Sequence, residues 1–403
     1  MKPLEGIRVV ELTTFVAAPT AALLMADWGA EVIKVEGING DPMRYVGTLR
    51  RMPYCSDDEN PYWDGISANK KFIALNPRTP EGMEMLKKLI DTADVFITNN
   101  RPAALEKMGL SYEEVEKRNP RLVYGQVLGY GEKGPEKDTP GFDYTAYVAR
   151  GGFLNNFTPE ESKYPFFSYS AFGDNQVGMA LASGIMAALL GRNVTGHGDR
   201  VTVSLYGTAI FVSKWALYEA EFGVKFPTST KAPTSPTVNA YKAKDGVWMM
   251  MCISEFDRYY DKLVMLLDRP DLLGHPVYSV VNNMVAEGKV EEFTAIMIEQ
   301  FAKKDSDEWL RLFQEADLPL AKGFTFDDIL ADEQAWANDY IREITYPTGH
   351  KAKVFPNPVQ MDRAGPQPFE RSKPLGYHDE YYAKELGYSD EQIAQMREKG
   401  AIR

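Results

Sequence analysis

Gly173 and Asp174 stand just before a long run of small and apolar residues, 179–190. That run has the composition of a closely packed helix. An aspartate in the first turn of a helix meets free backbone N–H groups and the positive end of the helix dipole. We therefore expect Asp174 to be ionised at neutral pH. Two roles fit such a carboxylate: it caps the helix, or it attacks an activated carbonyl carbon as a nucleophile.

Several other chemistries lack their motifs in this sequence. There is no Gly-x-x-x-x-Gly-Lys-Ser/Thr phosphate loop, no Gly-x-Gly-x-x-Gly after the first expected strand and no Gly-x-Ser-x-Gly nucleophile elbow. The glycine-rich segment 129–135 follows a later strand and ends in proline, so it is either a tight turn or a loop shaped for a ligand. The four histidines show no ligand spacing with Cys55 or Cys252, and we expect no metal site.

The composition is that of a globular metabolic protein. A chain of 403 residues is long enough for two or three domains, and its formal charge of −12 argues against nucleic acid or an anionic membrane as partner. Local basic groups can still hold an anionic ligand. Two cysteines and an N-terminus without a signal-peptide core predict a cytoplasmic protein, and the longest apolar stretch is too short to span a bilayer.

Strand and helix signals alternate in the first half of the chain. The helix expected over 18–28 ends at Gly29, Thr79 and Pro80 mark the start of another, and Ser111 with Glu114 forms a capping box. We expect strands at 7–12, 31–36, 70–76, 94–99 and 121–127. This alternation predicts an α/β, Rossmann-like domain with a parallel sheet.

The character changes near residue 221. A segment rich in Pro, Ser and Thr, 226–236, is typical of a linker or surface loop. After it we expect a strand at 246–252 and helices at 256–268, 290–303 and 307–317, followed by a return path from 329 and tail helices at 379–386 and 389–399. The predicted organisation is a large domain from 1–220 and 330–403, and a smaller α+β domain from 221–329.

An ordered series of motifs runs along the whole chain and resembles family III CoA-transferases. The motifs are LEGIRVVEL (4–12), AP (18–19), GAEVIKVE (29–36), GDPMR (40–44), NK (69–70), TPEG (79–82), ALEKMG (104–109), GYG (129–131) and GD (173–174). Three further segments, 134–135, 140–146 and 332–340, resemble the members that act on (R)-2-hydroxy acids such as 2-hydroxyisocaproate or phenyllactate.

The resemblance implies roles for individual residues. It makes Asp174 the catalytic aspartate and places Thr14 and Val16 in the substrate pocket. It implies contacts with CoA, a substrate rather than a tightly bound cofactor, from Ala17, Leu75, Arg78, Asn99, Asn100, Arg101, Lys107, Phe142 and Asp143. It also implies an interlocked homodimer.

The chain departs from formyl-CoA transferase at three places. Thr14 and Val16 replace a histidine and a glutamine, so the pocket for a very small acid is not reproduced. Gly37 replaces an arginine that holds CoA, which leaves Arg44 or another base for that task. Thr234–Thr237 stands near the place where a glycine-rich lid is expected, so that lid is not reproduced, and the sequence leaves the existence of a gating loop open.

The reaction implied is a double displacement that uses acyl-CoA and small carboxylic acids. Asp174 forms a mixed anhydride, then an aspartyl-CoA thioester, which an incoming acid cleaves; no ATP or metal is needed. The expected donor is a 2-hydroxyacyl- or 2-enoyl-CoA, and the expected acceptor is an (R)-2-hydroxy acid with a sizeable apolar side chain. A racemase or epimerase of the same fold, which needs an acid/base pair, and a non-catalytic acyl-CoA binder are the alternatives.

Overall fold

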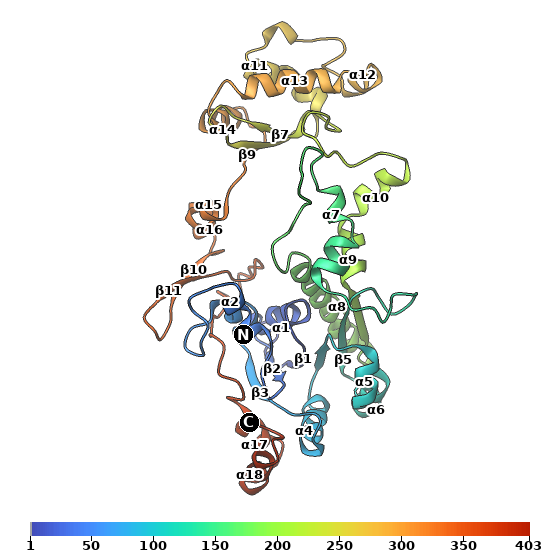
Figure 1. Ribbon diagram of the computed structural model, residues 1–403, viewed down its shortest axis with the longest axis vertical. Helices are drawn as coiled ribbons and strands as arrows, with labels where there is room; N and C mark the ends of the chain where they lie inside the picture. Colours follow the sequence, from blue (N-terminus) through green and yellow to red (C-terminus); the bar gives the residue numbers. More distant parts are fainter. Residues whose placement is uncertain (1) are drawn as a thin grey trace. The chain divides into compact units, whose positions relative to one another are not determined.

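The computed structural model describes residues 2–403 and divides into two compact units (Figure 1). The larger unit contains residues up to Gly152, Ser168–Lys214 and Glu333–Arg403. The smaller unit contains Phe153–Phe167 and Trp215–Asp332. Its second segment begins and ends a few residues outside the expected range 221–329, and its first segment was expected in the large domain. Phe157 explains that assignment, because its ring lies 5.2 Å from the ring of Phe226.

A six-stranded parallel sheet forms the centre of the larger unit. Its strands are β1 (Arg8–Leu12), β2 (Glu31–Glu36), β3 (Lys71–Ala74), β4 (Val95–Thr98), β5 (Val123–Leu128) and β6 (Arg200–Ser204). Their order is β3-β2-β1-β4-β5-β6, and Val9 of β1 pairs with Val32 on one side and Val95 on the other. The expected Rossmann-like α/β architecture is thereby confirmed.

Local sequence signals place several helices of this unit. Thr79 accepts a hydrogen bond from the Gly82 N–H and Ser111 accepts one from the Glu114 N–H, at the predicted helix starts. The helices are α1 (Ala17–Asp27), α2 (Met43–Leu49), α3 (Pro61–Ser67), α4 (Pro80–Asp91), α5 (Pro102–Met108), α6 (Tyr112–Arg118), α8 (Asp174–Thr195), α9 (Leu205–Val212), α16 (Glu333–Ala337), α17 (Asp379–Glu385) and α18 (Asp390–Glu398). A π-helical turn, Asp143–Ala149, and a hairpin of β10 (Arg342–Thr345) and β11 (Lys351–Val354) were not predicted.

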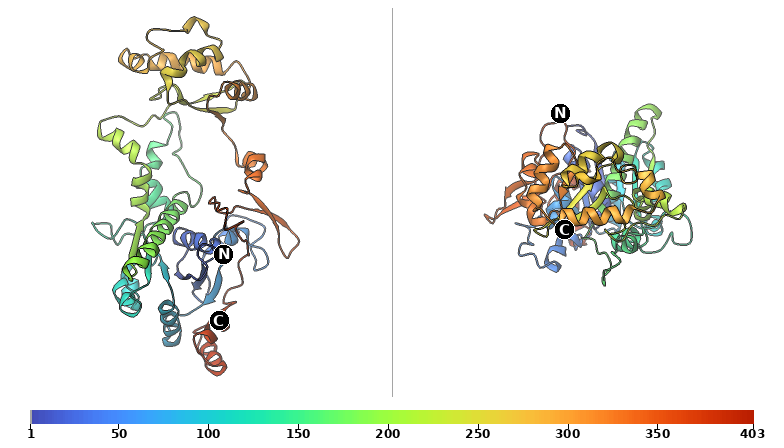
Figure 2. Two further views of the ribbon diagram at one scale, coloured as in Figure 1. Left: turned by 180° about the vertical axis from the view of Figure 1, so that it is seen from behind. Right: turned by 90° about the horizontal axis from the view of Figure 1, so that it is seen from above.

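Helix α8 packs against α1, β5 and β6, and the views in Figures 1 and 2 agree that α1 and α8 lie side by side. Among the described helices, only α8 is long and apolar enough to cross a membrane by length and composition. One face of the helix, which includes Val177, Leu181 and Ile185, is buried in the core of the larger unit.

The two ends of the chain share one hydrophobic core in the larger unit. Val10 and Phe96 from the sheet lie in the same buried cluster as Tyr382 and Ile393 from the C-terminal helices. Leu75, just after β3, forms a bridge with Ile402. The core is therefore complete only when the last residues of the chain are in place.

The smaller unit is α+β, as expected. Its antiparallel strands β7 (Val238–Lys242), β8 (Trp248–Cys252) and β9 (Leu320–Lys322) lie in the order β7-β8-β9. Its helices are α7 (Phe153–Asn156), α10 (Lys214–Glu221, of which all but Lys214 belongs to this unit), α11 (Phe256–Leu266), α12 (Val281–Ala286), α13 (Val290–Phe301), α14 (Ser306–Glu315) and α15 (Phe326–Ala331), with a 3₁₀ turn at Pro270–Leu272. Tyr241 and Trp309 stack on Phe301 in its core, with ring centroids 4.9 and 4.6 Å apart.

Candidate active site

The carboxyl ends of β1 and β4 form the point at which the sheet reverses its order. In open α/β sheets such a point opens a crevice that binds ligands. Asn99, after β4, fixes the loop after β1: its Nδ2 donates to the Thr14 carbonyl at 2.8 Å, and its Oδ1 accepts from the Thr14 N–H at 3.0 Å. Asn100 Nδ2 donates to the Leu12 carbonyl at 2.9 Å. In this structure both asparagines position the loop.

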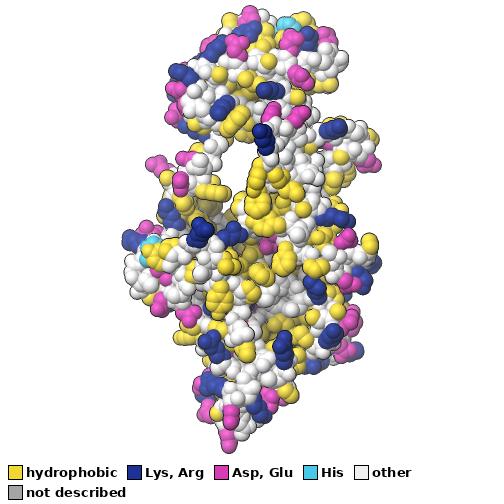
Figure 3. All heavy atoms as spheres, in the orientation of Figure 1, with side chains coloured by type: hydrophobic (Ala, Val, Ile, Leu, Met, Phe, Trp, Pro, Cys, Tyr) yellow, Lys and Arg dark blue, Asp and Glu magenta, His cyan; other side chains and the backbone are white. Residues whose placement is uncertain are grey.

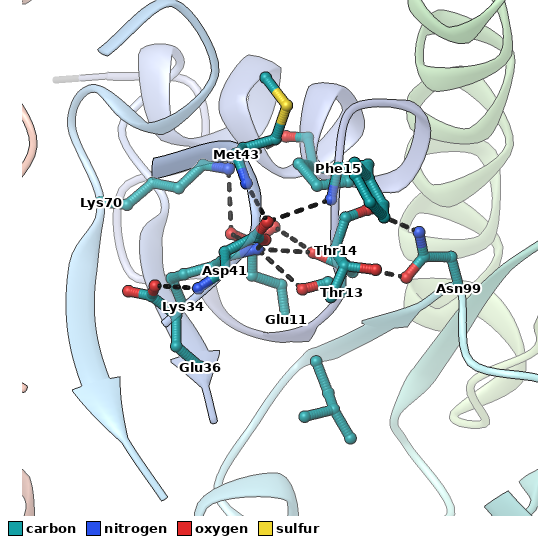
Figure 4. A network of polar contacts seen from close by, with 12 residues as sticks. Glu11, Thr13, Thr14, Phe15, Lys34, Glu36, Asp41, Met43, Lys70 and Asn99 are labelled. Carbon is teal, nitrogen blue, oxygen red and sulfur yellow. Dashed lines mark hydrogen bonds and ion pairs between the residues drawn. The ribbon is translucent and has the colours of Figure 1, made fainter. Parts of the chain in front are cut away.

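A buried cation lies beneath the same loop (Figure 4). Lys34 Nζ donates to the carbonyl of Thr13 at 2.9 Å and to Asp41 Oδ2 at 2.9 Å, and Glu11 lies 3.8 Å away. Burial opposes the charge, but the surrounding carboxylates, Glu11 first, raise the pKa of Lys34 above its ordinary value. Lys70 Nζ donates to Glu11 and completes the cluster at 3.0 Å.

Asp41 transmits this network to the loop. Its Oδ1 accepts from the N–H of Phe15 at 3.3 Å and of Met43 at 2.9 Å. Phe15 has a φ of 63°, in the left-handed region that a phenylalanine rarely adopts. The buried charges therefore hold a strained residue, which precedes Val16 and Ala17 at the start of α1.

Asp174 is the first residue of α8, as the sequence predicts. In the part of the chain that the structure describes, its carboxylate accepts no hydrogen bond, so it does not cap the helix. Burial, and then the charge of Asp143, raise the pKa of Asp174 to about 7. The sequence predicts that Asp174 is ionised at neutral pH, whereas burial in the folded chain raises its pKa, and the sequence does not show that burial.

Asp143, and not Asp174, accepts a hydrogen bond from a backbone N–H group at the start of α8. Its Oδ1 accepts from the Gly173 N–H at 2.8 Å, and its Oδ2 is buried without a hydrogen-bond partner. Burial raises the pKa of Asp143, and backbone N–H groups from Gly173 and Phe172 lower it. Two carboxylates, one bonded and one not, thus lie at one helix end.

Residue 173 must be glycine because the ring of Tyr147 lies very close to its backbone. A Cβ built on Gly173 would lie 2.1 Å from the ring of Tyr147. Tyr147 belongs to the same π-helical turn as Asp143, and its hydroxyl donates to Gln176 at 2.9 Å. At Gly178 a Cβ would lie 2.4 Å from the Thr20 side chain, so this glycine lets α8 approach α1. Both glycines set the position of the Asp174 backbone.

A cavity of about 670 Å³ in the larger unit joins these residues. Val16, Phe142, Asp143 and Asp174, all predicted site residues, line it. The sequence analysis missed Phe15, whose ring meets that of Phe142 edge-on at 5.7 Å. Most of the remaining wall is apolar and includes Met43, Val46, Met52, Ile66 and Phe369.

The other predicted residues are not among those that line this cavity. Thr14 is exposed and is not among the residues that line the cavity, and Ala17 is buried at the start of α1. The side chain of Leu75 is fully buried in the core. Arg78, Arg101 and Lys107 follow β3 or β4, and each is an exposed cation without an ion pair among the described residues.

Arg44 is not available to replace the arginine lost at Gly37. Its guanidinium makes two hydrogen bonds of 2.7 Å to Glu36 and lies 4.6 Å from the ring of Trp63. The side chain is buried, so the expectation for Arg44 is wrong. The pairing joins residues from β2 and α2, a tertiary contact that the sequence does not reveal. In the smaller unit, Thr237 is fully buried and donates to the Ile253 carbonyl, which anchors the end of segment Thr234–Thr237.

The comparisons with known proteins agree over nearly the whole chain. An (R)-2-hydroxy-4-methylpentanoate CoA-transferase from Clostridioides difficile is 41% identical over 400 residues, which cover 99% of each chain. A cinnamoyl-CoA:phenyllactate CoA-transferase from Clostridium sporogenes is 39% identical, over 97% of this chain and 95% of that protein.

Solved structures give the same result at the level of the fold. The crystal structure of a hypothetical protein from Mycobacterium tuberculosis superposes with a TM-score of 0.80 and 27% identity, covering 95% of this chain and 99% of that one. A CAIB/BAIF family protein from Brucella suis has a TM-score of 0.78 and 27% identity, covering 96% and 99%. The family model described as CoA-transferase family III matches residues 4–379, and the chain, an enzyme that transfers CoA, belongs to that family.

Proposed function

We propose that this enzyme transfers CoA from a 2-hydroxyacyl- or 2-enoyl-CoA to an (R)-2-hydroxy acid with a sizeable apolar side chain. The observation that carries the proposal is Asp174, which lines a largely apolar cavity and makes no hydrogen bond there in the described structure. The names of the two relatives near 40% identity support the substrate class, and their activity favours transfer over racemisation. Burial of a leucine- or phenylalanine-sized side chain contributes roughly 1.5–3 kcal/mol.

Asp174 acts as the nucleophile in this proposal. Its carboxylate attacks the thioester carbonyl, the C–S bond breaks, and a mixed anhydride and CoA thiolate form. The thiolate then attacks the aspartyl carbonyl, which gives an aspartyl-CoA thioester and releases the first acid. An incoming carboxylate cleaves that thioester, and the thiolate finally attacks the new acyl group. The backbone N–H group at Ala17 is a candidate oxyanion donor, whereas that of Gly173 already donates to Asp143.

Exposed cations are the candidate anchors for the phosphates of CoA. Arg78, Arg101 and Lys107 have no ion-pair partner among the described residues and follow the carboxyl ends of β3 and β4. Arginine and lysine in such positions bind phosphate by charge-assisted hydrogen bonds. Asn99 and Asn100 contribute to CoA binding in this proposal because they hold the loop after β1 in place. The backbone around Leu75 is a further proposed contact with CoA.

Trapping of the covalent intermediate tests the mechanism. The enzyme is incubated with acyl-CoA and then with hydroxylamine or borohydride, and peptides are analysed by mass spectrometry. We expect modification of Asp174 and loss of turnover in the wild type, and neither trapping nor transfer in Asp174→Asn. Asp362→Asn, at an exposed position, is the matched control and keeps both. An unmodified Asp174 in inactivated enzyme contradicts the mechanism.

A panel of acceptors tests the substrate class. Oxalate, lactate, 2-hydroxyisocaproate, phenyllactate and carnitine are assayed with one donor. We expect kcat/KM to be highest for the two acids with large apolar side chains. A preference for oxalate or carnitine contradicts the substrate proposal and leaves the transferase activity untouched.

The dimer is part of the same proposal. On the larger unit, Leu190 and Val194 of α8 and Phe211 of α9 are 69%, 89% and 67% exposed. Figure 3 shows that the molecule carries exposed hydrophobic side chains on the face drawn there. Apolar surface of this kind is typical of a surface that meets another protein, and we propose that a second copy of this chain covers it.

A further inference from the structure

The wall of the cavity at Asp174 carries few charged groups that lack a partner. Asp64 accepts from Ser372 and Tyr346, and Asp27 accepts from Asn69 and Asn357. Arg342 is paired with Asp339. These groups are occupied by the fold, so they do not attract a charged ligand strongly.

Arg50 is different. It ends α2, its guanidinium donates to the Ser170 hydroxyl, and it forms no ion pair among the described residues. Ser170 Oγ lies 3.3 Å from the hydroxyl of Tyr144. Ser170 stands four residues before Asp174 and Tyr144 directly follows Asp143, so the hydrogen-bonded trio is tied to both carboxylates through the backbone.

The cavity needs a cation if an anionic acid is to enter it. Asp174 is a neutral thioester when the acid enters, but Asp143 lines the same space, and its negative charge repels a carboxylate. Lys353, a second cation of the wall without an ion pair in the described chain, lies on β11 with its Nζ 5.9 Å from the ring of Trp336. Arg50 is the cation bonded to the segment that precedes Asp174, and a guanidinium binds a carboxylate through two parallel hydrogen bonds.

We propose that Arg50, with Ser170 and Tyr144, forms the subsite that recognises the free acid: the guanidinium binds its carboxylate, and the two hydroxyl groups bind its 2-hydroxyl group. This inference rests on the proposed function. Met43, Val46 and Met52, on the wall beside Arg50, receive the apolar side chain. The acid then attacks the aspartyl-CoA carbonyl through a carboxylate oxygen, the C–S bond breaks, the electron pair leaves with the CoA thiolate, and no proton is transferred.

The subsite distinguishes the two substrates by charge. A free acid presents a carboxylate to Arg50, whereas the same group in an acyl-CoA is a neutral thioester. Removal of the guanidinium therefore weakens binding of the acid and leaves binding of the acyl-CoA unchanged. Removal of a side chain that only maintains the fold would affect binding of the acid and of the acyl-CoA alike.

The first experiment is the Arg50→Met variant, with Arg51→Met as the matched control. Arg51 is an adjacent exposed arginine without an ion pair in the described structure. In Arg50→Met we expect the KM for the acceptor acid, measured with 2-hydroxyisocaproate, to rise about tenfold or more. The KM for the acyl-CoA is expected to stay within about twofold of the wild type. Arg50→Lys keeps the positive charge but cannot form the two parallel hydrogen bonds of a guanidinium, so we expect a KM for the acid between those of the wild type and Arg50→Met. Equal changes in both KM values, or no change in the acid KM, overturn the proposal.

Trapping separates a failure of this inference from a failure of the proposed function. The extent of aspartyl-CoA formed from acyl-CoA alone is expected to be the same in Arg50→Met and wild type, while its discharge by added acid is slower. Absence of trapping in the wild type refutes the mechanism itself. Normal trapping with unchanged discharge refutes only the role of Arg50.

The hydroxyl groups are tested by an acceptor that lacks the 2-hydroxyl group. Ser170→Ala and Tyr144→Phe are expected to reduce the preference for 2-hydroxyisocaproate over 4-methylpentanoate by about tenfold, because the hydrogen bonds to the 2-hydroxyl group are lost. An unchanged ratio in both variants overturns this part of the subsite.

Discussion

At the scale of single residues, Asp143 and Asp174 occupy one end of α8 and differ in their hydrogen bonds, although burial raises the pKa of both. Asp143 accepts from the Gly173 N–H, whereas Asp174 has no hydrogen-bond donor in the described structure and a pKa of about 7. A carboxylate with a raised pKa is more basic and less stabilised by its surroundings than an exposed one. These properties suit a nucleophile. The negative charge of the Asp174 carboxylate is poorly solvated in the resting enzyme, and the carboxylate loses that charge when it forms a bond to the acyl group.

The raised pKa of Asp174 makes folding stability depend on pH. The folded pKa lies above the value of about 3.9 in the unfolded chain, so ionisation costs stability progressively as pH rises from about 4 to about 7. Asn resembles the protonated form at every pH. Asp174→Asn is therefore expected to match the wild type near pH 4 and to exceed its unfolding free energy by about 2 kcal/mol at pH 8. Denaturant unfolding at both pH values measures this; a wild type more stable than the variant at pH 8 refutes it.

Gly173 is expected to tolerate no side chain. Gly173→Ala places a methyl group against the ring of Tyr147, where a Cβ has only 2.1 Å of space. We expect a loss of about 3 kcal/mol of stability and of most activity, since overpacking shifts the backbone. Adding Tyr147→Leu creates space and recovers part of the stability. Thermal unfolding of the single and double variants provides the check, and a double variant no more stable than Gly173→Ala contradicts the steric explanation.

At the scale of elements, the loop between β1 and α1 is held from below by charges and from the side by Asn99. A loop with Phe15 at positive φ does not keep that conformation through its own sequence. The network of Lys34, Asp41 and Glu11 supplies the constraint, and it does so inside the protein, where water does not screen it (Figure 4).

Asp41→Asn tests this constraint with almost no change of shape. The amide oxygen can still accept from Phe15 and Met43, but Lys34 loses its ion pair at 2.9 Å. We expect a loss of about 3 kcal/mol of stability, because a buried cation loses the nearer of its two counterions and keeps only Glu11. Lys34→Met in the same chain is expected to recover part of the loss. Chemical denaturation of the four proteins of the cycle measures the coupling, and a loss below about 0.5 kcal/mol in Asp41→Asn rules out a strong constraint.

Elements set by local chemistry were predictable from the sequence, and those set by distant contacts were not. Thr79 and Ser111 indicate helix starts because a cap is made within three residues. The segment 238–242 mixes polar and apolar residues and becomes strand β7 only beside β8. The same division holds at the site. The position of Asp174 followed from the sequence, but its protonation depends on burial and on a carboxylate from another element.

At the scale of the whole molecule, exposed apolar helices are the most informative surface. In the smaller unit, Trp215 and Phe222 are 70% and 83% exposed, in and just after α10. We expect light scattering to give the mass of a dimer, twice 45.3 kDa, at micromolar concentration. If the subunits are interlocked, dilution to nanomolar concentration leaves the dimer intact over hours, because the chains must open before they part. A monomer at micromolar concentration contradicts the assembly.

The shared core of the two chain ends has a consequence for synthesis. Ala74 of β3 bonds to Asp379, 305 residues further on, and Leu75 meets Ile402, the second-to-last residue. At roughly 5–20 residues per second, a ribosome needs on the order of tens of seconds to make the intervening chain. During that time the edge of the sheet at β3 is uncovered on the nascent chain. A chain cut off before Asp379 leaves this edge open, and we expect it to be more sensitive to proteases.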